Sequence, residues 1–331
     1  MNKRQLLVLM LGANLLRGGT GVRAQPASGA AQHIGVLSFG SPPGGANPDP
    51  NGGLRAGLVE LGWVEGRNLV TEWRYADGQH ERLAPLAAEL VRRKVALIIA
   101  GGPASIHAAR SATTTIPIVA IGGADPVGDG WAQSLARPGG NTTGFTATFP
   151  ELGSKQMEIL KEAIPGLKRM AVMQAPADYS KKIDRTILLS GARAMGIELV
   201  WLEVSGPGDF ESAFGVALQH RAQGLFAPAT NLIVTHRHRL AELAQRQRLP
   251  TISDFPLMAQ AGFLLSYGAD IDALGRRAAR YVDKILKGAQ PGELPFDRPT
   301  HFELVANLTV ARAMGITLPA AIVQRIDRVI E

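Results

Sequence analysis

The stretch RPGGNTTGFTATFPE, residues 137–151, interrupts a chain that otherwise alternates between strand and helix patterns. Residues 137–144 combine a proline and three glycines with short polar side chains, which is typical of a loop. Residues 144–149 then indicate a short strand, and an apolar helix is expected from Glu151. Because the alternation restarts after this stretch, we interpret 137–144 as a hinge between two lobes. An ordinary surface loop would have the same composition.

The chain before this stretch alternates regularly. Residues 95–100 are continuously apolar, which is typical of a parallel strand covered on both faces. In residues 81–93 the apolar side chains recur at the spacing of one helix face, which predicts a helix packed on a sheet. The other elements expected here are strands at 34–39, 69–75 and 117–121, and helices at 52–61, from Pro103 and from Asp125.

The same alternation resumes after the stretch. Two successive runs of strands and helices predict an α/β fold with two doubly wound lobes, each built on a parallel sheet with right-handed crossovers. The elements expected in the second run are helices at 151–164, 182–195, 209–223 and 235–246, and strands at 169–173, 198–204, 225–228 and 250–253.

The end of the chain is too short for a third domain. It predicts a strand at 263–267, a helix at 271–286, a strand at 302–307 and closing helices to Glu331. We expect the chain to cross back to the first lobe and then to return to the second, so that three segments form the hinge. The expected boundaries are 33–142 plus 268–297 for the first lobe, and 143–267 plus 298–331 for the second.

The N-terminus has the layout of a secretory signal peptide. Lys3 and Arg4 precede an apolar run at 6–16, and a small-residue cleavage site ends at Ala24. The run is shorter than the about 20 apolar residues that span a bilayer. We expect residues 1–24 to be cleaved after Ala24 on export and the remaining chain to be periplasmic. A disordered N-terminus or an uncleaved anchor is the alternative.

Part of the positive charge belongs to this predicted leader. The formal net charge of the whole chain is +7, and removal of the leader's four cations, with no acid, leaves +3 (7 − 4). The remaining basic residues are spread along the chain, whereas a nucleic-acid interface needs a clustered basic face, so no nucleic-acid partner is expected. The chain has no cysteine, which excludes disulfides and thiolate metal sites.

Catalytic and cofactor motifs are missing from the sequence. It has no GxSxG elbow, no phosphate-binding loop with its lysine, and no GxGxxG placed after a strand with an acid at the right distance. His236 and His238 lie two positions apart in a predicted helix and therefore face different directions, whereas paired ligands on a helix lie three or four apart. We expect no enzyme activity, no cofactor and no metal site.

Glycines and small polar residues instead follow the predicted strands. Ligands of open α/β sheets bind beyond the carboxyl ends of the strands. Glycines there give access to backbone N–H groups at helix N-termini, which favour an anionic group, while Asp125 or Asp254 suits an ammonium. Turns use the same residues, but their repetition over six loops favours a cleft for an amino-acid-like or carboxylate solute. The candidate ligand-binding residues are Ser38, Phe39, Ser41, Gly102, Pro103, Ala104, Ser105, Gly123, Ala124, Asp125, Gln174, Asp178, Thr230, Asn231, Ser253 and Asp254.

Four segments resemble the exported solute-binding proteins of ABC transporters, in the branch that includes aromatic-amino-acid binders. The segments are GLVELGWVEGRNLVTEWRYADGQHERLAPLAAELV (57–91), TTTIPIVAIGGADPVGDGWAQSLARPGGNTTG (113–144), LLSYGADIDALGRRAARYVDKILKGAQPGELP (264–295) and FELVANLTVARAMGITLP (302–319). The resemblance covers nearly the whole chain after the leader. It implies the type I periplasmic binding protein fold, with the solute held between the lobes by the loops named above.

Two positions depart from the aromatic-amino-acid binders. Gly102 stands where they tend to have a threonine before Pro-Ala, and Thr230-Asn231 stands where they have Asp-Asn. An aromatic amino acid is therefore one candidate ligand among others.

The resemblance implies a monomeric receptor of an ABC importer that delivers a small-molecule solute to an ABC permease at the inner membrane. A receptor that senses a solute for a membrane signalling partner fits the same sequence. A two-lobed α/β enzyme is the less favoured alternative, because no nucleophile accompanies Asp125 and Asp254.

Overall fold

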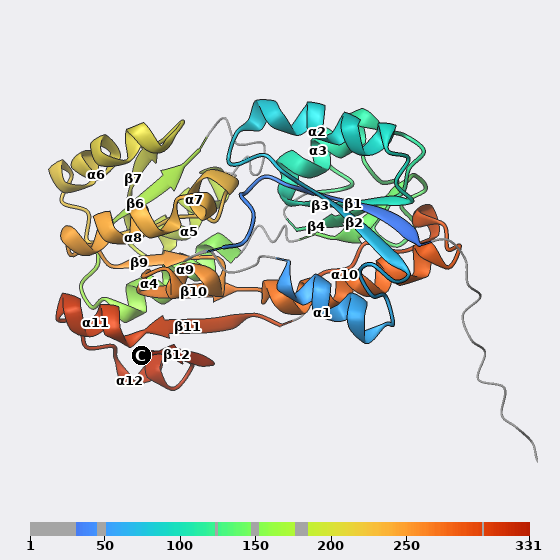
Figure 1. The fold of residues 1–331 in the computed structure, drawn as a ribbon. Helices are drawn as coiled ribbons and strands as arrows, with labels where there is room; N and C mark the ends of the chain where they lie inside the picture. The colour runs from blue at the N-terminus through green and yellow to red at the C-terminus, as the bar shows by residue number, and fades with distance from the viewer. Residues whose placement is uncertain (1–30, 45–50, 123–124, 147–151, 176–184, 300) are drawn as a thin grey trace, which may run out of the picture. The chain divides into compact units, whose positions relative to one another are not determined.

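The computed structural model describes residues 31–44, 51–122, 125–146, 152–175, 185–299 and 301–331, and the chain from Ala31 to Glu331 forms one compact unit. Two sheets, each with helices on both faces, make up two lobes (Figure 1). The predicted α/β class with two parallel-sheet lobes is confirmed. The predicted signal peptide lies outside the described residues.

The first sheet has the strand order β2-β1-β3-β4-β5, and all of its strands are parallel. Helices α2 and α3 cover one face, and helices α1 and α10 cover the other. Its strands are β1 (Gln32–Ser38), β2 (Leu69–Tyr75), β3 (Leu97–Gly101), β4 (Ile118–Ile121) and β5 (Thr142–Phe145). Its helices are α1 (Gly52–Glu60), α2 (His80–Arg92), α3 (Gly102–Ala112) and α10 (Ile271–Leu286).

The second sheet has the order β12-β11-β10-β9-β8-β6-β7. Its first five strands along the chain are arranged β7-β6-β8-β9-β10, which repeats the order β2-β1-β3-β4-β5 of the first sheet. Strand β11 runs antiparallel to β10, because the chain reaches it from the first lobe. The strands are β6 (Arg169–Gln174), β7 (Glu198–Glu203), β8 (Gly224–Phe226), β9 (Thr251–Ser253), β10 (Leu265–Gly268), β11 (Glu303–Asn307) and β12 (Arg328–Ile330).

The helices of the second lobe divide between the two faces of its sheet (Figure 1). One face packs against α4 (Leu152–Ala163), α5 (Arg185–Ala194), α11 (Leu308–Met314) and α12 (Ala320–Val323). The other face packs against α6 (Phe210–Gln219), α7 (Asn231–Thr235), α8 (Arg237–Arg246) and α9 (Pro256–Gln260). Two short 3-10 turns, η1 (Pro207–Asp209) and η2 (Pro291–Glu293), complete the helical elements of the described residues.

Strand β3 shows why the apolar runs in the sequence are continuous. Ile98 and Ala100 pack against α2 and α3, while Leu97 and Ile99 pack on the opposite face with α1 and α10. All four side chains are buried. Successive side chains of a strand point to opposite faces, so a strand between two helical layers must be apolar at every position.

The predicted position of the hinge, residues 137–144, is wrong. Thr142–Phe145 form β5, which pairs with β4 as the edge strand of the first sheet. Its polar side chains bond within that lobe: Arg110 Nη1 donates to Thr142 Oγ1 at 2.9 Å, and Thr143 Oγ1 donates to the Leu294 carbonyl at 2.7 Å. The boundary predicted after residue 142 therefore falls inside a strand, and the chain leaves the first sheet after Phe145.

The hinge has three segments, and Asp297 connects two of them. Its backbone N–H donates to the Gly144 carbonyl at 2.8 Å, and its carbonyl accepts from the Thr146 N–H at 3.0 Å. Its carboxylate pairs with Arg277 of α10, the helix that follows the second crossing. Residues 144–146 and Asp297 therefore lie side by side where the first and third crossings begin, and α10 contacts both through Arg277, which pairs with Asp297 and stacks on Phe145.

Two other expectations differ from the structure. No helix begins at Asp125: residues 125–131 form turns, and the Asp125 carboxylate accepts from the N–H groups of Val127 (3.2 Å) and Gly128 (3.0 Å). The chain closes with strand β12 rather than with a helix, because 328–330 pair with β11.

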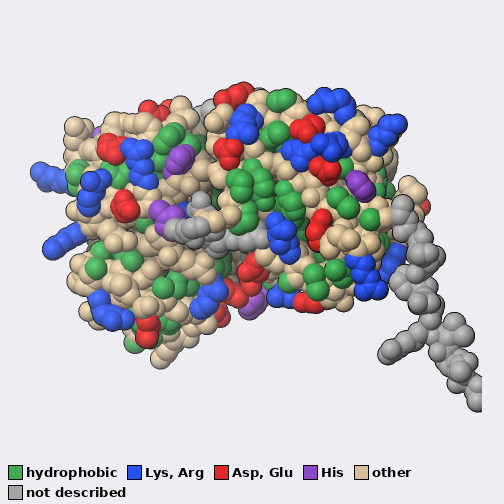
Figure 2. Space-filling model, in the orientation of Figure 1, with side chains coloured by type: hydrophobic (Ala, Val, Ile, Leu, Met, Phe, Trp, Pro, Cys, Tyr) green, Lys and Arg blue, Asp and Glu red, His purple; other side chains and the backbone are tan. Residues whose placement is uncertain are grey.

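The surface carries mixed charges. On the face seen in Figure 2, Lys and Arg side chains are interspersed with Asp and Glu side chains over both lobes. Within the described ranges, no helix has the length and apolar character needed to span a membrane.

We expect Gly144→Ala to destabilise the first lobe. Gly144 has a φ of +135°, and a Cβ at this position would lie 2.1 Å from the Ala120 carbonyl oxygen of the neighbouring strand. Backbone strain and overpacking should lower the free energy of unfolding by about 3 kcal/mol or more, measured by urea denaturation. Gly140→Ala is the control, since its nearest atom would be 3.9 Å away. Equal urea midpoints for the two variants would contradict this account of β5.

Candidate functional site

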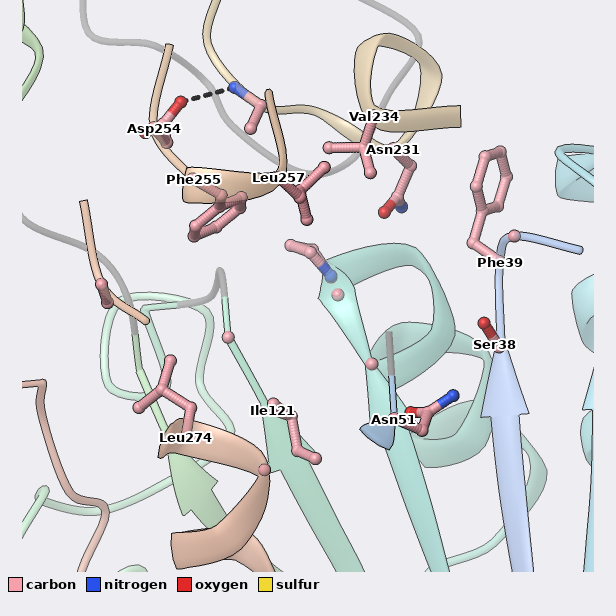
Figure 3. Close-up of a pocket in the computed structure, with 18 of the residues that line it drawn as sticks. Ser38, Phe39, Asn51, Ile121, Asn231, Val234, Asp254, Phe255, Leu257 and Leu274 are labelled. Carbon is pink, nitrogen blue, oxygen red and sulfur yellow. Dashed lines mark hydrogen bonds between the residues drawn. The ribbon is translucent and has the colours of Figure 1, made fainter. Parts of the chain in front are cut away.

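A cavity of about 220 Å³ lies at the carboxyl ends of strands from both sheets (Figure 3). The first lobe contributes the residues after β1, β3 and β4 and the start of α1: Ser38, Phe39, Gly40, Asn51, Leu54, Gly101, Gly102, Pro103, Ile121 and Gly122. The second lobe contributes Leu152, Ala229, Asn231, Val234, Thr235, Asp254, Phe255 and Leu257. The hinge segments and the start of α10 contribute Ala269, Leu274, Gly275 and Phe302.

The strand order explains why the cavity forms at this edge. In the order β2-β1-β3, the helix after β1 covers one face of the sheet and the helix after β3 covers the other. The segments that follow β1 and β3 therefore diverge at the strand ends and leave a crevice between them. Ser38 and Gly101, which pair across β1 and β3, are the last residues before this divergence.

Most of the cavity wall is apolar. In Figure 3 the side chains of Ile121 and Leu274 face those of Phe255 and Leu257 across the cavity, with Phe39 at one end. Apolar walls with a few placed polar groups are typical of small-molecule sites. The cavity therefore suits a solute with an apolar or aromatic body.

Asp254 is the only ionisable side chain among the described lining residues. Asp254 is 3% exposed, and its Oδ2 accepts a hydrogen bond from the Ala229 N–H at 2.5 Å. This bond holds the carboxylate at the end of β9. A carboxylate in the wall of a cavity can form a charge-assisted hydrogen bond with a cationic group on a solute.

Asn231 places an amide in the same cavity wall. It is the first residue of α7, and the Thr230 hydroxyl caps that helix by accepting from the Ile233 N–H at 3.4 Å. The Asn231 side chain extends from the second lobe toward the first (Figure 3). Its Nδ2 atom is buried and has no hydrogen-bond partner among the described residues. A buried unpaired donor of this kind favours an acceptor on a solute.

Not all of the predicted ligand-binding residues meet at the cavity. Those that line it are Ser38, Phe39, Gly102, Pro103, Asn231 and Asp254. Those that the structure places elsewhere are Ser41, Ala104, Ser105, Asp125, Gln174, Thr230 and Ser253. Gly123, Ala124 and Asp178 lie outside the described residues.

The displaced candidates have structural roles that composition does not reveal. Ala104 and Ser105 turn into the buried side of α3. The Ser253 hydroxyl donates to the Ala227 carbonyl at 2.5 Å, and Gln174 Oε1 accepts from Arg185 Nε at 2.8 Å. Strand residues alternate between faces, so adjacent residues at a strand end have different surroundings.

Several lining residues were missed because they come from distant parts of the chain. Leu274 reaches the cavity through a close approach of α10 to α1, where a Cβ on Gly53 would lie 2.0 Å from the Asp272 carbonyl oxygen. Leu54 and Phe302 have no neighbouring polar or glycine signal that separates them from ordinary core residues. Of the signals in the sequence, only Gly53 indicates that α1 packs closely against another helix.

A cavity at the strand ends of two doubly wound lobes, bordered by a three-segment hinge, defines a two-lobed solute-binding protein. The model of the family described as ABC transporter substrate binding protein matches residues 34–330. The chain belongs to this family.

Known proteins with similar sequence or structure agree with this assignment. A tyrosine-binding protein of Clostridioides difficile (strain R20291) is 27% identical over 264 residues, which are 80% of this chain and 76% of that protein. A conserved domain protein from Vibrio cholerae has a TM-score of 0.83 at 27% identity, covering 90% of this chain and 99% of that chain. The ABC domain of Streptococcus pneumoniae in complex with L-Trp has a TM-score of 0.82 at 23% identity, covering 91% and 100%, and shares the fold.

We expect stability to depend on the neutral form of His236, the residue that follows helix α7 as its C-cap. Its ring packs edge-on against Phe210, with centroids 5.7 Å apart. Burial, and secondarily Arg239, lowers the pKa of His236 below its usual value of about 6.5. The folded state then binds this proton less readily than the unfolded state. The stability is present above about pH 6.5 and is lost as the pH falls through the lowered pKa.

Urea unfolding at about pH 7.5 and about pH 5 measures this loss. His236→Gln should reduce the difference between the two pH values, while His220→Gln, which changes an exposed histidine of the same lobe, should leave it as in the wild type. An unchanged pH dependence in His236→Gln would contradict the assignment.

Proposed function

We propose that this protein is an exported, monomeric receptor that binds one small amino-acid-like solute in the cavity and delivers it to an ABC permease at the inner membrane. The observation that carries the proposal is the apolar cavity at the strand ends, with Asp254 as the only ionisable side chain among its described residues. Family membership and the leader-like residues 1–24 support export to the periplasm.

Binding divides between the apolar walls and the polar groups. We assign the ammonium of the solute to Asp254, and its apolar body to the wall that includes Phe255 and Leu274. We assign the first-lobe side of the solute to Ser38, Phe39, Gly102 and Pro103, which were expected from the sequence and line the cavity.

The energy of such contacts is sufficient for a receptor. Burial of an aromatic side chain of 150–250 Å² contributes about 4–6 kcal/mol. A charge-assisted hydrogen bond adds about 1.5–3 kcal/mol. After the cost of association, a micromolar affinity, about −8 kcal/mol, requires the apolar body and at least two polar contacts together. A solute that lacks either part should bind weakly.

Release and capture require the lobes to move about the hinge. The solute binds between them and favours the closed arrangement by its contacts with both, which shifts an existing equilibrium. The three crossings near Asp297 provide the positions at which the backbone can bend.

Aromatic amino acids are the first solutes to test, because the C. difficile relative is a tyrosine-binding protein and the S. pneumoniae structure contains L-Trp. In a thermal-shift screen of amino acids and small carboxylates, at least one amino acid should raise the melting temperature of the protein as its concentration increases. No shift with any of them would contradict the proposal.

Asp254→Asn tests the assignment of the ammonium. This change should weaken L-tyrosine or L-tryptophan binding about 10–100-fold in isothermal titration, because it removes one charge-assisted bond. The affinity for the desamino analogue of the same solute should change little in this variant, since the analogue has no ammonium to pair with Asp254. Equal losses for both solutes would show that Asp254 acts only on the shape of the site.

A further inference from the structure

Gly102 and Asn231 meet across the cavity from different lobes. Gly102 begins α3 after strand β3, and Asn231 begins α7. A Cβ built on Gly102 would lie 2.9 Å from Asn231 Oδ1 and 3.6 Å from its Nδ2. Gly102 also has a φ of +76°, which side chains other than glycine rarely adopt. The carboxamide therefore occupies the space that a side chain at position 102 would need.

The same helix meets a second glycine of the first lobe. A Cβ on Gly78, in the turn after β2, would lie 3.4 Å from Thr235 Cγ2 at the other end of α7. Thr235 also lines the cavity. Both ends of helix α7 therefore approach the first lobe at a glycine.

The buried Nδ2 of Asn231 gives this contact a chemical consequence. Nδ2 has no partner among the described residues although it lies beside a cavity with an acid, Asp254, elsewhere in its wall. A buried donor without a protein partner discriminates strongly between solutes that do and do not carry an acceptor at that position.

We propose that Gly102 is a specificity-determining residue: because it lacks a side chain, the Asn231 amide can extend toward the first lobe and donate to the carboxylate of the solute, while Asp254 binds the ammonium on the same carbon. This inference rests on the proposed function. A side chain at position 102 displaces the amide and removes the selection for a carboxylate.

The test compares L-tyrosine with tyramine, which lacks the carboxylate, in isothermal titrations of Gly102→Ala, Asn231→Ala and the double variant. The wild type should prefer L-tyrosine, and each single variant should reduce that preference about 10–100-fold. The double variant should reduce it no further than Asn231→Ala alone, because Gly102 acts through Asn231. Gly66→Ala is the control for backbone strain, since Gly66 has a φ of +75° and no atom within 4 Å of a built Cβ.

A Gly102→Ala variant that keeps the wild-type preference, or a double variant whose loss is the product of the single losses, would overturn the inference. If the wild type binds neither probe, the same comparison uses the amino acid that raises the melting temperature in the screen and its decarboxylated amine. If no amino acid binds, the proposed function fails, and the selection for a carboxylate fails with it.

Thermal midpoints without solute test the contact independently. Gly102→Ala should lower the midpoint on the order of 2–4 °C more than Gly66→Ala, and adding Asn231→Ala should remove this excess. An excess that persists in the double variant would show that Asn231 does not restrict position 102.

Discussion

The pairing of the first and third crossings through Asp297 is the constraint on which the rest of the structure depends. The backbone of Asp297 bonds to Gly144 and Thr146, and its carboxylate pairs with Arg277. These contacts bring the start of α10 and the segment before β11 to the same edge as the strand ends of both sheets. The cavity forms at this edge because both sheets are covered by helices on their faces and are open only at their ends.

The composition of the cavity follows from the same architecture. Strand ends and helix starts supply glycines, short polar residues and some apolar side chains, and the hinge and α10 add others such as Leu274. Asp254 and Asn231 both belong to the second lobe, while the first-lobe turns that border the cavity include four glycines, Gly40, Gly101, Gly102 and Gly122.

The sequence predicted the elements with strong periodicity and the two-lobe class. The continuous apolar run at 95–100 and the helix at 81–93 correspond to β3 and α2 within a few residues. The hinge was misplaced because glycines and a proline mark turns whether or not the chain changes lobes. Thr142 and Thr143 are β-branched and suit an edge strand. The glycines and the proline beside them indicate a turn more strongly, so no strand was predicted at these two positions.

The site was only partly accessible from the sequence. Strand ends were the right places to look, and they identified Asp254, Asn231 and Gly102 as residues at the cavity. Ser253 and Ser105 were indistinguishable from them in type, yet their side chains turn into the protein. Leu54 and Leu274 meet only because α1 and α10 pack together across more than 200 residues of chain, a long-range contact that no local pattern encodes.

The central claim, that the space between the strand ends holds the solute, is tested most directly by native mass spectrometry of the protein isolated from its own host. The account predicts one small solute per wild-type chain, released on unfolding, and none on Ser38→Trp, whose added ring would fill the cavity from the end of β1. The same solute on both proteins, or none on either, would contradict it.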